Sequence, residues 1–141
     1  METSGCKDLS TLSELVCLVD IFLLDYKHVN EKLLDYYTNE SAAVLNNNIR
    51  YLNKILKPVI LRCPIIPSVN DTKEHFQGII KTAMENDNIK EINILPYHCF
   101  GENKQKLIFN THNTFPTPNQ ETIDNWVKIL TEQNSKPVIV L

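Results

Sequence analysis

The stretch Ile92–His98 (INILPYH) carries the pattern on which the fold prediction depends. Its first residues are apolar and mostly β-branched, which is typical of a strand that is buried on both faces. A proline follows, and the chain then leads through Tyr97 to His98 and into a loop that contains Gly101 and Lys104. Because this strand ends at a protonatable side chain, we ask where the other predicted strands end.

The same strand-like composition recurs along the chain, with helix-like stretches between. The expected strands are Asp20–Lys27, Val59–Arg62, Glu91–Leu95 and Pro137–Leu141. The intervening apolar residues recur about every 3.6 residues, as on one face of a helix. The expected helices are 8–16, 41–56, 72–86 and 118–133, with Ser41 and Thr72 as N-caps and Pro118 in a first turn.

The alternating order predicts an α/β fold with parallel strands and right-handed crossovers. About four strands with flanking helices are too few to close a barrel. Residues 2–5 (ETSG) are expected to form a turn, and a further strand is expected to precede it. We therefore predict one domain, residues 1–141, that forms a partial (β/α) barrel.

Composition argues against several functional classes. Of the 141 residues, 43% are hydrophobic and 22% are charged, as in ordinary globular proteins. The net charge of −3 and the absence of a Lys/Arg cluster argue against nucleic-acid binding. The run Leu15–Leu24 is interrupted by Asp20 and is too short to span a membrane. Without a signal-peptide pattern at the start, we expect a cytoplasmic protein.

The cysteines, at positions 6, 17, 63 and 99, have no CxxC spacing. We therefore expect no metal or cluster site built from this chain alone. Cys17 and Cys63 are expected to be small core residues, and Cys99 has no assigned role. The histidines at 28, 75 and 112 are expected in loops or on helix surfaces, whereas Tyr26 and Trp126 are expected to pack in the core.

Charged or protonatable side chains end three consecutive predicted strands. Asp25 and Lys27 end the first on one face, Arg62 ends the second and His98 ends the third. Ligands of parallel α/β sheets bind beyond the carboxyl ends of the strands. These groups suit a ligand with a carboxylate or phosphate, with Asp25 as an acceptor for an amine or hydroxyl.

Each of these residues also has a purely structural interpretation. Asp25 and Lys27 can form a simple ion pair, and Arg62 can brace the loop 64–71. A single histidine such as His98 is more often a structural hydrogen-bonding group than a ligand group. Their coincidence at one end of the sheet favours a shared site.

Four stretches together resemble the activating enzymes of glycyl-radical enzymes, in the radical S-adenosylmethionine superfamily. They are ETSG (2–5), DIFLLDYKH (20–28), LRCPIIPSVND (61–71) and LPYHCFGENK (95–104). The likeness covers nearly all of this chain but about the C-terminal half of a family member. It implies that residues 1–141 are half of a radical S-adenosylmethionine (β/α)6 barrel.

The resemblance also implies a chemistry and a set of partners. In the family a CxxxCxxC loop holds a 4Fe–4S cluster, and an electron donor drives reductive cleavage of S-adenosylmethionine. The resulting 5′-deoxyadenosyl radical takes hydrogen from a glycine of the partner enzyme. Activases of formate-lyases, of diol or glycerol dehydratases and of decarboxylases share these stretches.

The site residues that the resemblance implies are Asp25, Lys27, Arg62, His98, Glu2 and Thr3. Asp25 and Lys27 would contact S-adenosylmethionine, Arg62 would lie near its carboxylate or ribose, and His98 near its nucleoside. Glu2 and Thr3, with the backbone at Leu23, resemble the family's monovalent cation site.

The chain also departs from the family pattern. CxxxCxxC and the glycine-rich strand motif are absent, so this chain alone is expected to be inactive. Ser68 and Asn39 stand where the family usually has glycine, and Asn adopts positive φ more readily than Ser.

Two other functions remain open. One is a non-enzymatic remnant or binding module that docks a partner or an adenosyl ligand. The other is an unrelated phosphate-binding α/β enzyme, which is disfavoured because no glycine-rich phosphate loop is present. We also expect the first strand to be an exposed sheet edge through which the chain associates with itself.

Overall fold

Five parallel strands form one sheet, and their order in space is their order in the chain, β1-β2-β3-β4-β5. The computed structural model describes residues 1–98 and 115–141. The strands are β1 (Glu2–Thr3), β2 (Phe22–Asp25), β3 (Val59–Ile65), β4 (Ile89–Pro96) and β5 (Val138–Val140). The helices are the 3-10 helix η1 (Leu9–Leu12), α1 (Ser13–Cys17), α2 (Glu31–Thr38), α3 (Ala42–Lys54), α4 (Lys73–Glu85) and α6 (Gln120–Glu132).

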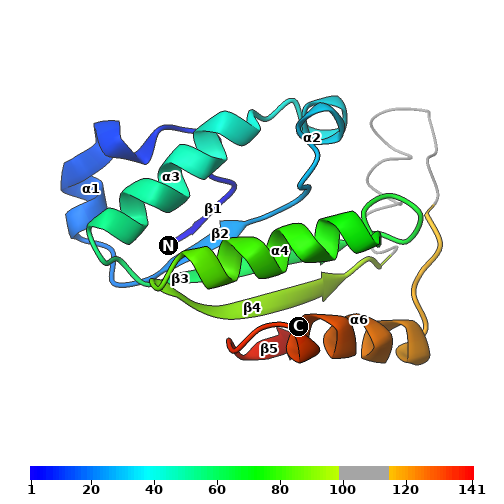
Figure 1. The fold of residues 1–141 in the computed structure, drawn as a ribbon. Coiled ribbons are helices and arrows are strands. Elements are labelled where there is room, and N and C mark those ends of the chain that lie inside the picture. The colour runs from blue at the N-terminus through cyan, green and yellow to red at the C-terminus, as the bar shows by residue number, and fades with distance from the viewer. Residues whose placement is uncertain (99–114) are drawn as a thin grey trace.

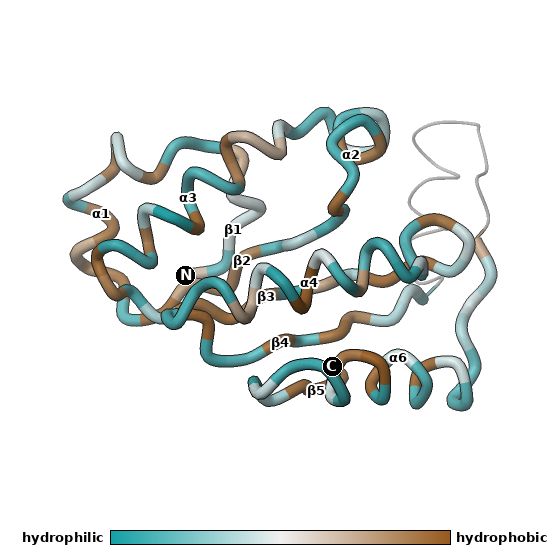
Figure 2. The backbone as a smooth tube through the Cα atoms, viewed as in Figure 1, coloured by the Kyte–Doolittle hydropathy of each residue, from teal (hydrophilic) through white to brown (hydrophobic). Residues whose placement is uncertain are grey.

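Because each right-handed crossover adds the next strand on the same side, the connecting helices cover one face of the sheet. Figure 1 shows α3 and α4 lying along the strands, with α6 beside β4 and β5. Each of these helices combines hydrophilic and hydrophobic stretches (Figure 2), so each can face both the sheet and the solvent. The predicted partial barrel of parallel strands with flanking helices is confirmed.

The strand count differs from the prediction because Glu2–Thr3 forms a strand instead of a turn. β1 pairs with Leu23 and Leu24 of β2, and the carbonyl of Met1 accepts the Leu23 N–H at 2.8 Å. A strand of two residues is too short to show an alternating pattern in the sequence. The predicted strand Asp20–Lys27 is therefore not the sheet edge, as was expected; β1 forms the edge, and self-association through an edge stays a prediction.

Helix α2 was not predicted, although its apolar residues are spaced as on one face of a helix. Only Leu34 of this helix is buried, whereas Tyr36 and Tyr37 are exposed. Two local features define its ends. The side chain of Asn30 accepts the Leu33 N–H, and Asn39 ends the helix in the left-handed conformation with φ of 55°.

Two predicted boundaries were wrong for local reasons. β3 continues through Pro64 to Ile65, where a loop was expected, and pairs with β4 as far as Pro96. Helix α6 begins at Gln120 because the side chain of Asn119 caps the Thr122 N–H, so Pro118 precedes the helix.

The two faces of the sheet differ by alternation, which is clearest in β3. In β3, Val59, Leu61, Cys63 and Ile65 are buried, whereas Ile60, Arg62 and Pro64 are only half-buried. The buried set joins one hydrophobic cluster with residues of α3, α4 and α6, so it lies on the covered face. The opposite row forms what we call the open face.

Core expectations are confirmed for Tyr26, Cys63 and Trp126, but not for Cys17. Cys17 is exposed because the five-residue helix α1 points its neighbour Val16 into the core. No helix in residues 1–98 or 115–141 is long and apolar enough to cross a membrane.

His28 lies in a loop, as expected, but it is buried, and His75, expected on a helix surface or in a loop, is buried in α4. His28 is 6% exposed and His75 is 0% exposed. The His75 ring lies 5.3 Å from that of His28 and stacks on Tyr26 at 5.9 Å. The alternation of buried and half-buried residues continues past the end of β2, so Tyr26 and His28 face α4. His75 is the first of the buried residues of α4.

Candidate functional site

The open face carries a line of charged side chains on β1, at the carboxyl end of β2 and in the middle of β3, where Arg62 was wrongly predicted to end the strand. The parallel register places Asp25 beside Arg62, and neighbouring residues in register point to the same face. The Arg62 guanidinium forms an ion pair with Glu2 of β1 through Nη1. Thus β1, although only two residues long, brings a carboxylate to the predicted site.

Lys27 extends this line beyond the end of β2. Its Nζ donates to Oε1 of Glu40 at 2.6 Å and lies 3.8 Å from Oδ2 of Asp25. The resulting charged row consists of Glu2, Arg62, Asp25, Lys27 and Glu40, with alternating signs. Glu40 was missed by sequence reasoning because helix α2, which positions it, was not predicted.

Burial decides the protonation behaviour of Asp25. Its side chain is 26% exposed, and desolvation raises the pKa of the carboxyl above its ordinary value. The cations Lys27 and Arg62 act in the opposite direction, and the carboxylates Glu2 and Glu40 add to the rise. The ionised carboxylate is therefore incompletely compensated, and a positive group of a ligand would stabilise it.

Arg62 retains a donor that no described residue uses. Its side chain is 17% exposed, and Nε is buried without a hydrogen-bond partner among residues 1–98 and 115–141. An unsatisfied buried donor of a charged group is costly, so a ligand acceptor at this position would relieve the cost. The donor set of the row therefore fits a ligand that carries a carboxylate and a cationic group.

The remaining predicted residues are placed differently. Thr3 is in register with the buried Leu24, and its hydroxyl accepts the Gly5 N–H at 3.1 Å, so it is not part of the row. His98 is exposed, two residues beyond β4 at the same end of the sheet. Cys99, Gly101, Lys104 and His112 lie outside the described residues.

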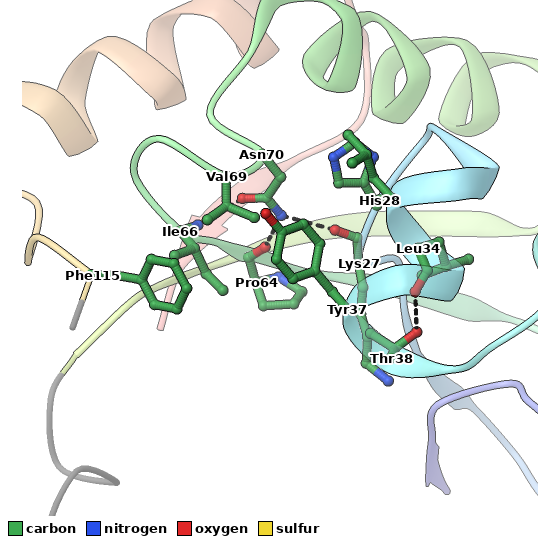
Figure 3. Close-up of a pocket in the computed structure, with 11 residues that line it drawn as sticks. Lys27, His28, Leu34, Tyr37, Thr38, Pro64, Ile66, Val69, Asn70 and Phe115 are labelled. Atoms are coloured by element: carbon green, nitrogen blue, oxygen red, sulfur yellow. Dashed lines mark hydrogen bonds between the residues drawn. The ribbon is translucent and has the colours of Figure 1, made fainter. Parts of the chain in front are cut away.

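A cavity of about 230 Å³ adjoins the row at Lys27. Figure 3 shows Tyr37, Ile66 and Phe115 around it, and its further walls include Leu33, Leu34 and Val69. The walls are mainly apolar because the polar groups present bond to one another. Thr38, for example, donates to the Leu34 carbonyl at 2.7 Å.

Asn70 fixes the two strand ends that border this cavity. Its Nδ2 donates to the carbonyls of Lys27 and Pro64 at 2.8 and 2.7 Å, and its Oδ1 accepts the Ile66 N–H at 2.7 Å. Figure 3 shows the amide between these segments. The nearby Ser68 has φ of 66°, so it adopts the left-handed backbone despite its side chain.

The described cysteines do not fit a 4Fe–4S cluster. Cys6 and Cys17 are exposed on separate segments, and Cys63 is buried on the covered face, where burial raises the pKa of its thiol. No three His, Cys, Asp or Glu side chains within the described ranges are grouped so as to hold a metal ion.

Sequence comparison finds relatives of one kind, although no family model matches the chain. It is 32% identical over 98 residues to the pyruvate formate-lyase-activating enzyme of Streptococcus mutans, covering 70% of this chain and 37% of that protein. It is 28% identical over 111 residues to the choline trimethylamine-lyase activating enzyme of Oleidesulfovibrio alaskensis, with 77% and 36% covered. The 4-hydroxyphenylacetate decarboxylase activating enzyme of Clostridioides difficile is 30% identical over 106 residues, with 74% and 33% covered.

Solved structures show the same fold. A domain of the pyruvate-formate lyase-activating enzyme from Bacteroides vulgatus matches 98% of this chain and 78% of that domain, with TM-score 0.76 and 21% identity. A radical SAM methyltransferase from Sphaerobacter thermophilus matches with TM-score 0.64 and 18% identity, over 99% of this chain and 39% of that protein. The chain thus spans little more than a third of the curated relatives that it matches. Over most of its own length, it is related in sequence to the activating enzymes of glycyl-radical enzymes.

Proposed function

We propose that this chain forms the C-terminal half of the barrel of a radical S-adenosylmethionine activase that acts on a glycyl-radical enzyme. The observation that carries the proposal is the charged row on the open face, with the unpartnered Nε of Arg62 in it. The relatives support the kind of partner, since each is named as the activating enzyme of a lyase or decarboxylase.

The residues of the row have distinct roles in this proposal. Lys27 and Arg62 bind the carboxylate of S-adenosylmethionine, and Asp25 accepts from its ammonium group. His98 lies toward the nucleoside, and Glu2 contributes to a monovalent cation site. The bound ligand supplies a reactive sulfonium, while this chain binds and orients it.

The proposed activity needs more than these residues. The described cysteines do not fit a cluster, so the cluster loop and the electron donor have to come from outside the part of the chain that the structure describes. We also propose that the β1 edge allows self-association, which light scattering at tens of micromolar would test; a clean monomer would count against it.

The proposal predicts that this chain binds S-adenosylmethionine through the row. In isothermal titration, Lys27→Ala should weaken binding by about tenfold to a hundredfold, because a charge-assisted hydrogen bond contributes about 1.5–3 kcal/mol. His98→Ala should weaken it less. Lys81→Ala removes an exposed cation on α4, whose only described partner is Glu85 at 3.9 Å, and should leave affinity unchanged. Unchanged affinity in both site variants would show that the assignment is wrong.

A second candidate is a non-enzymatic module that binds an adenosyl ligand or docks a partner. It is favoured by the combination of an intact charged row with cysteines that do not fit a cluster. The intact mass of the native protein separates the two candidates. A mass well above 16.3 kDa, with CxxxCxxC in the additional sequence, supports the activase, whereas a mass of 16.3 kDa supports the module.

A further inference from the structure

The position of the Lys27 ammonium depends on a residue outside the strands. Lys27 lies two residues beyond the end of β2 and has a long side chain with many rotamers, so the strand direction places its backbone but not its ammonium group. Of the two carboxylates beside it, only Glu40 is at hydrogen-bond distance, 2.6 Å, while Asp25 is 3.8 Å away. Glu40 therefore determines where the ammonium lies.

Glu40 is positioned by the left-handed residue that ends helix α2. Asn39 ends α2 with φ of 55°, and its N–H donates to the Asp35 carbonyl at 2.7 Å. The left-handed residue reverses the chain and directs the next side chain back toward the end of β2. The side chains of Lys27 and Glu40 are only 25% and 17% exposed, so solvent screens this pair less than an ordinary surface pair.

We propose that Glu40 is a positioning residue that holds the Lys27 ammonium at the mouth of the site and directs its remaining N–H donors to the anionic group of the ligand. An ammonium has three donors, and Glu40 occupies one of them. The inference rests on the proposed function of the row. Because α2 also lines the adjoining cavity through Leu34 and Thr38, the same ion pair joins that wall to the row.

Net charge alone predicts that neutralising Glu40 strengthens the binding of an anionic group, whereas the positioning role predicts that it weakens binding. The direction of the change in affinity therefore tests the inference. The row contains three carboxylates and two cations, so neutralising Glu40 makes it less negative and, by charge alone, would favour an anionic group. If Glu40 positions Lys27, the same change weakens binding. Glu40→Gln preserves the size of the side chain and separates these two effects.

The first measurement is the ¹⁵Nζ signal of the Lys27 ammonium in the 141-residue chain. We expect a resolved signal in the wild type and in Asp35→Asn. This control removes an exposed carboxylate from helix α2, which precedes Glu40. Glu40→Ala should lose the signal through fast exchange with solvent, and Glu40→Asp should restore part of it. A signal that does not depend on Glu40 would overturn the inference.

The second measurement is S-adenosylmethionine affinity by titration calorimetry. We expect affinity to fall about threefold to tenfold in Glu40→Gln and Glu40→Ala, because the residual ion-pair energy is modest, and to stay constant in Asp35→Asn. Equal or tighter binding by Glu40→Gln would overturn the positioning role while leaving the ligand site intact. No binding by the wild type would overturn the proposed function itself, whatever the ammonium signal shows.

Discussion

The covered and open faces of the sheet share the same strands yet have opposite chemistry. On the covered face, Leu24, Leu61 and Ile94 are each 0% exposed and belong to one hydrophobic cluster. One residue further along, Asp25 and Arg62 lie on the open face within the charged row. The period of two along a strand thus separates the residues that stabilise the fold from those that we propose bind the ligand.

Polar groups are accommodated differently on the two faces. On the covered side, Asn48 is 0% exposed and satisfied by the backbone alone, since it accepts from Leu9 and donates to Gly5 and Lys7. On the open face, charged groups compensate one another and remain partly exposed. Substitutions on the covered face should therefore change stability, and those on the open face mainly binding.

The largest expected effect comes from the centre of the covered face. Leu61→Ala should lower the free energy of unfolding by about 2–5 kcal/mol, because it removes a fully buried side chain and leaves a cavity. The matched control, Ile60→Ala, removes a half-buried side chain from the open face and should cost about 1 kcal/mol. Urea unfolding measures both, and equal losses would contradict the comparison.

Protonation of the buried histidines on the covered face should lower the stability of the protein at acid pH. Burial, and secondarily His28, lowers the pKa of His75 to about 3, whereas the unfolded chain titrates near 6.5. The unfolded state then binds the proton first, so stability is full above pH 6.5 and falls as the pH decreases. The loss from His75 should reach about 2 kcal/mol by pH 5.

The control for this pH dependence is His75→Phe, which keeps an aromatic ring against Tyr26 but cannot titrate. It should have a flatter stability curve between pH 7 and pH 5, measured by urea unfolding. Its stability at pH 7 should be lower, because the Val29 N–H loses its acceptor on the His75 ring. Parallel curves for the two proteins would show that folding does not lower the pKa of His75.

A smaller effect is expected where helix α4 approaches the chain after β2. A Cβ added at Gly78 would lie 2.4 Å from Cγ2 and 2.7 Å from Cβ of Val29. Gly78→Ala should therefore lower stability by about 1–2 kcal/mol, even though alanine favours a helix by up to about 1 kcal/mol. Gln77→Ala, at the exposed neighbouring position, should shift the melting temperature little; a stabilised Gly78→Ala would contradict the close packing.

The smallest effect has the opposite sign and lies on the open face. Burial raises the pKa of Asp25, so its ionised form costs stability at neutral pH. Asp25→Asn should raise the melting temperature by about 1–3 °C at pH 7. This gain should vanish as the pH falls toward 3.8, where the wild-type carboxyl takes up its proton. The control is Asp20→Asn, at an exposed position. An equal rise in melting temperature in this variant would show that burial of Asp25 is not the cause.

Local sequence patterns predicted the elements that carry their own signal. The strands around Leu61 and Ile92 and the helix capped by Thr72 follow from apolar periodicity and a hydrogen-bonding cap, both of which are properties of adjacent residues. The same alternation assigned Asp25 and Lys27 to one face and Tyr26 to the other. Prediction failed for β1, which is too short to show a pattern, and for α2, whose helical spacing of apolar residues was overlooked.

The sequence by itself determined the parallel α/β fold and the polar residues that lie on or next to its strands. Only the tertiary structure decided which of them meet. Register brought Glu2 to Arg62, the αL turn at Asn39 brought Glu40 to Lys27, and packing of α4 buried His75. Periodicity reports how a segment relates to its own neighbours, whereas these contacts join residues far apart in the chain. Their geometry depends on how whole strands and helices pack together.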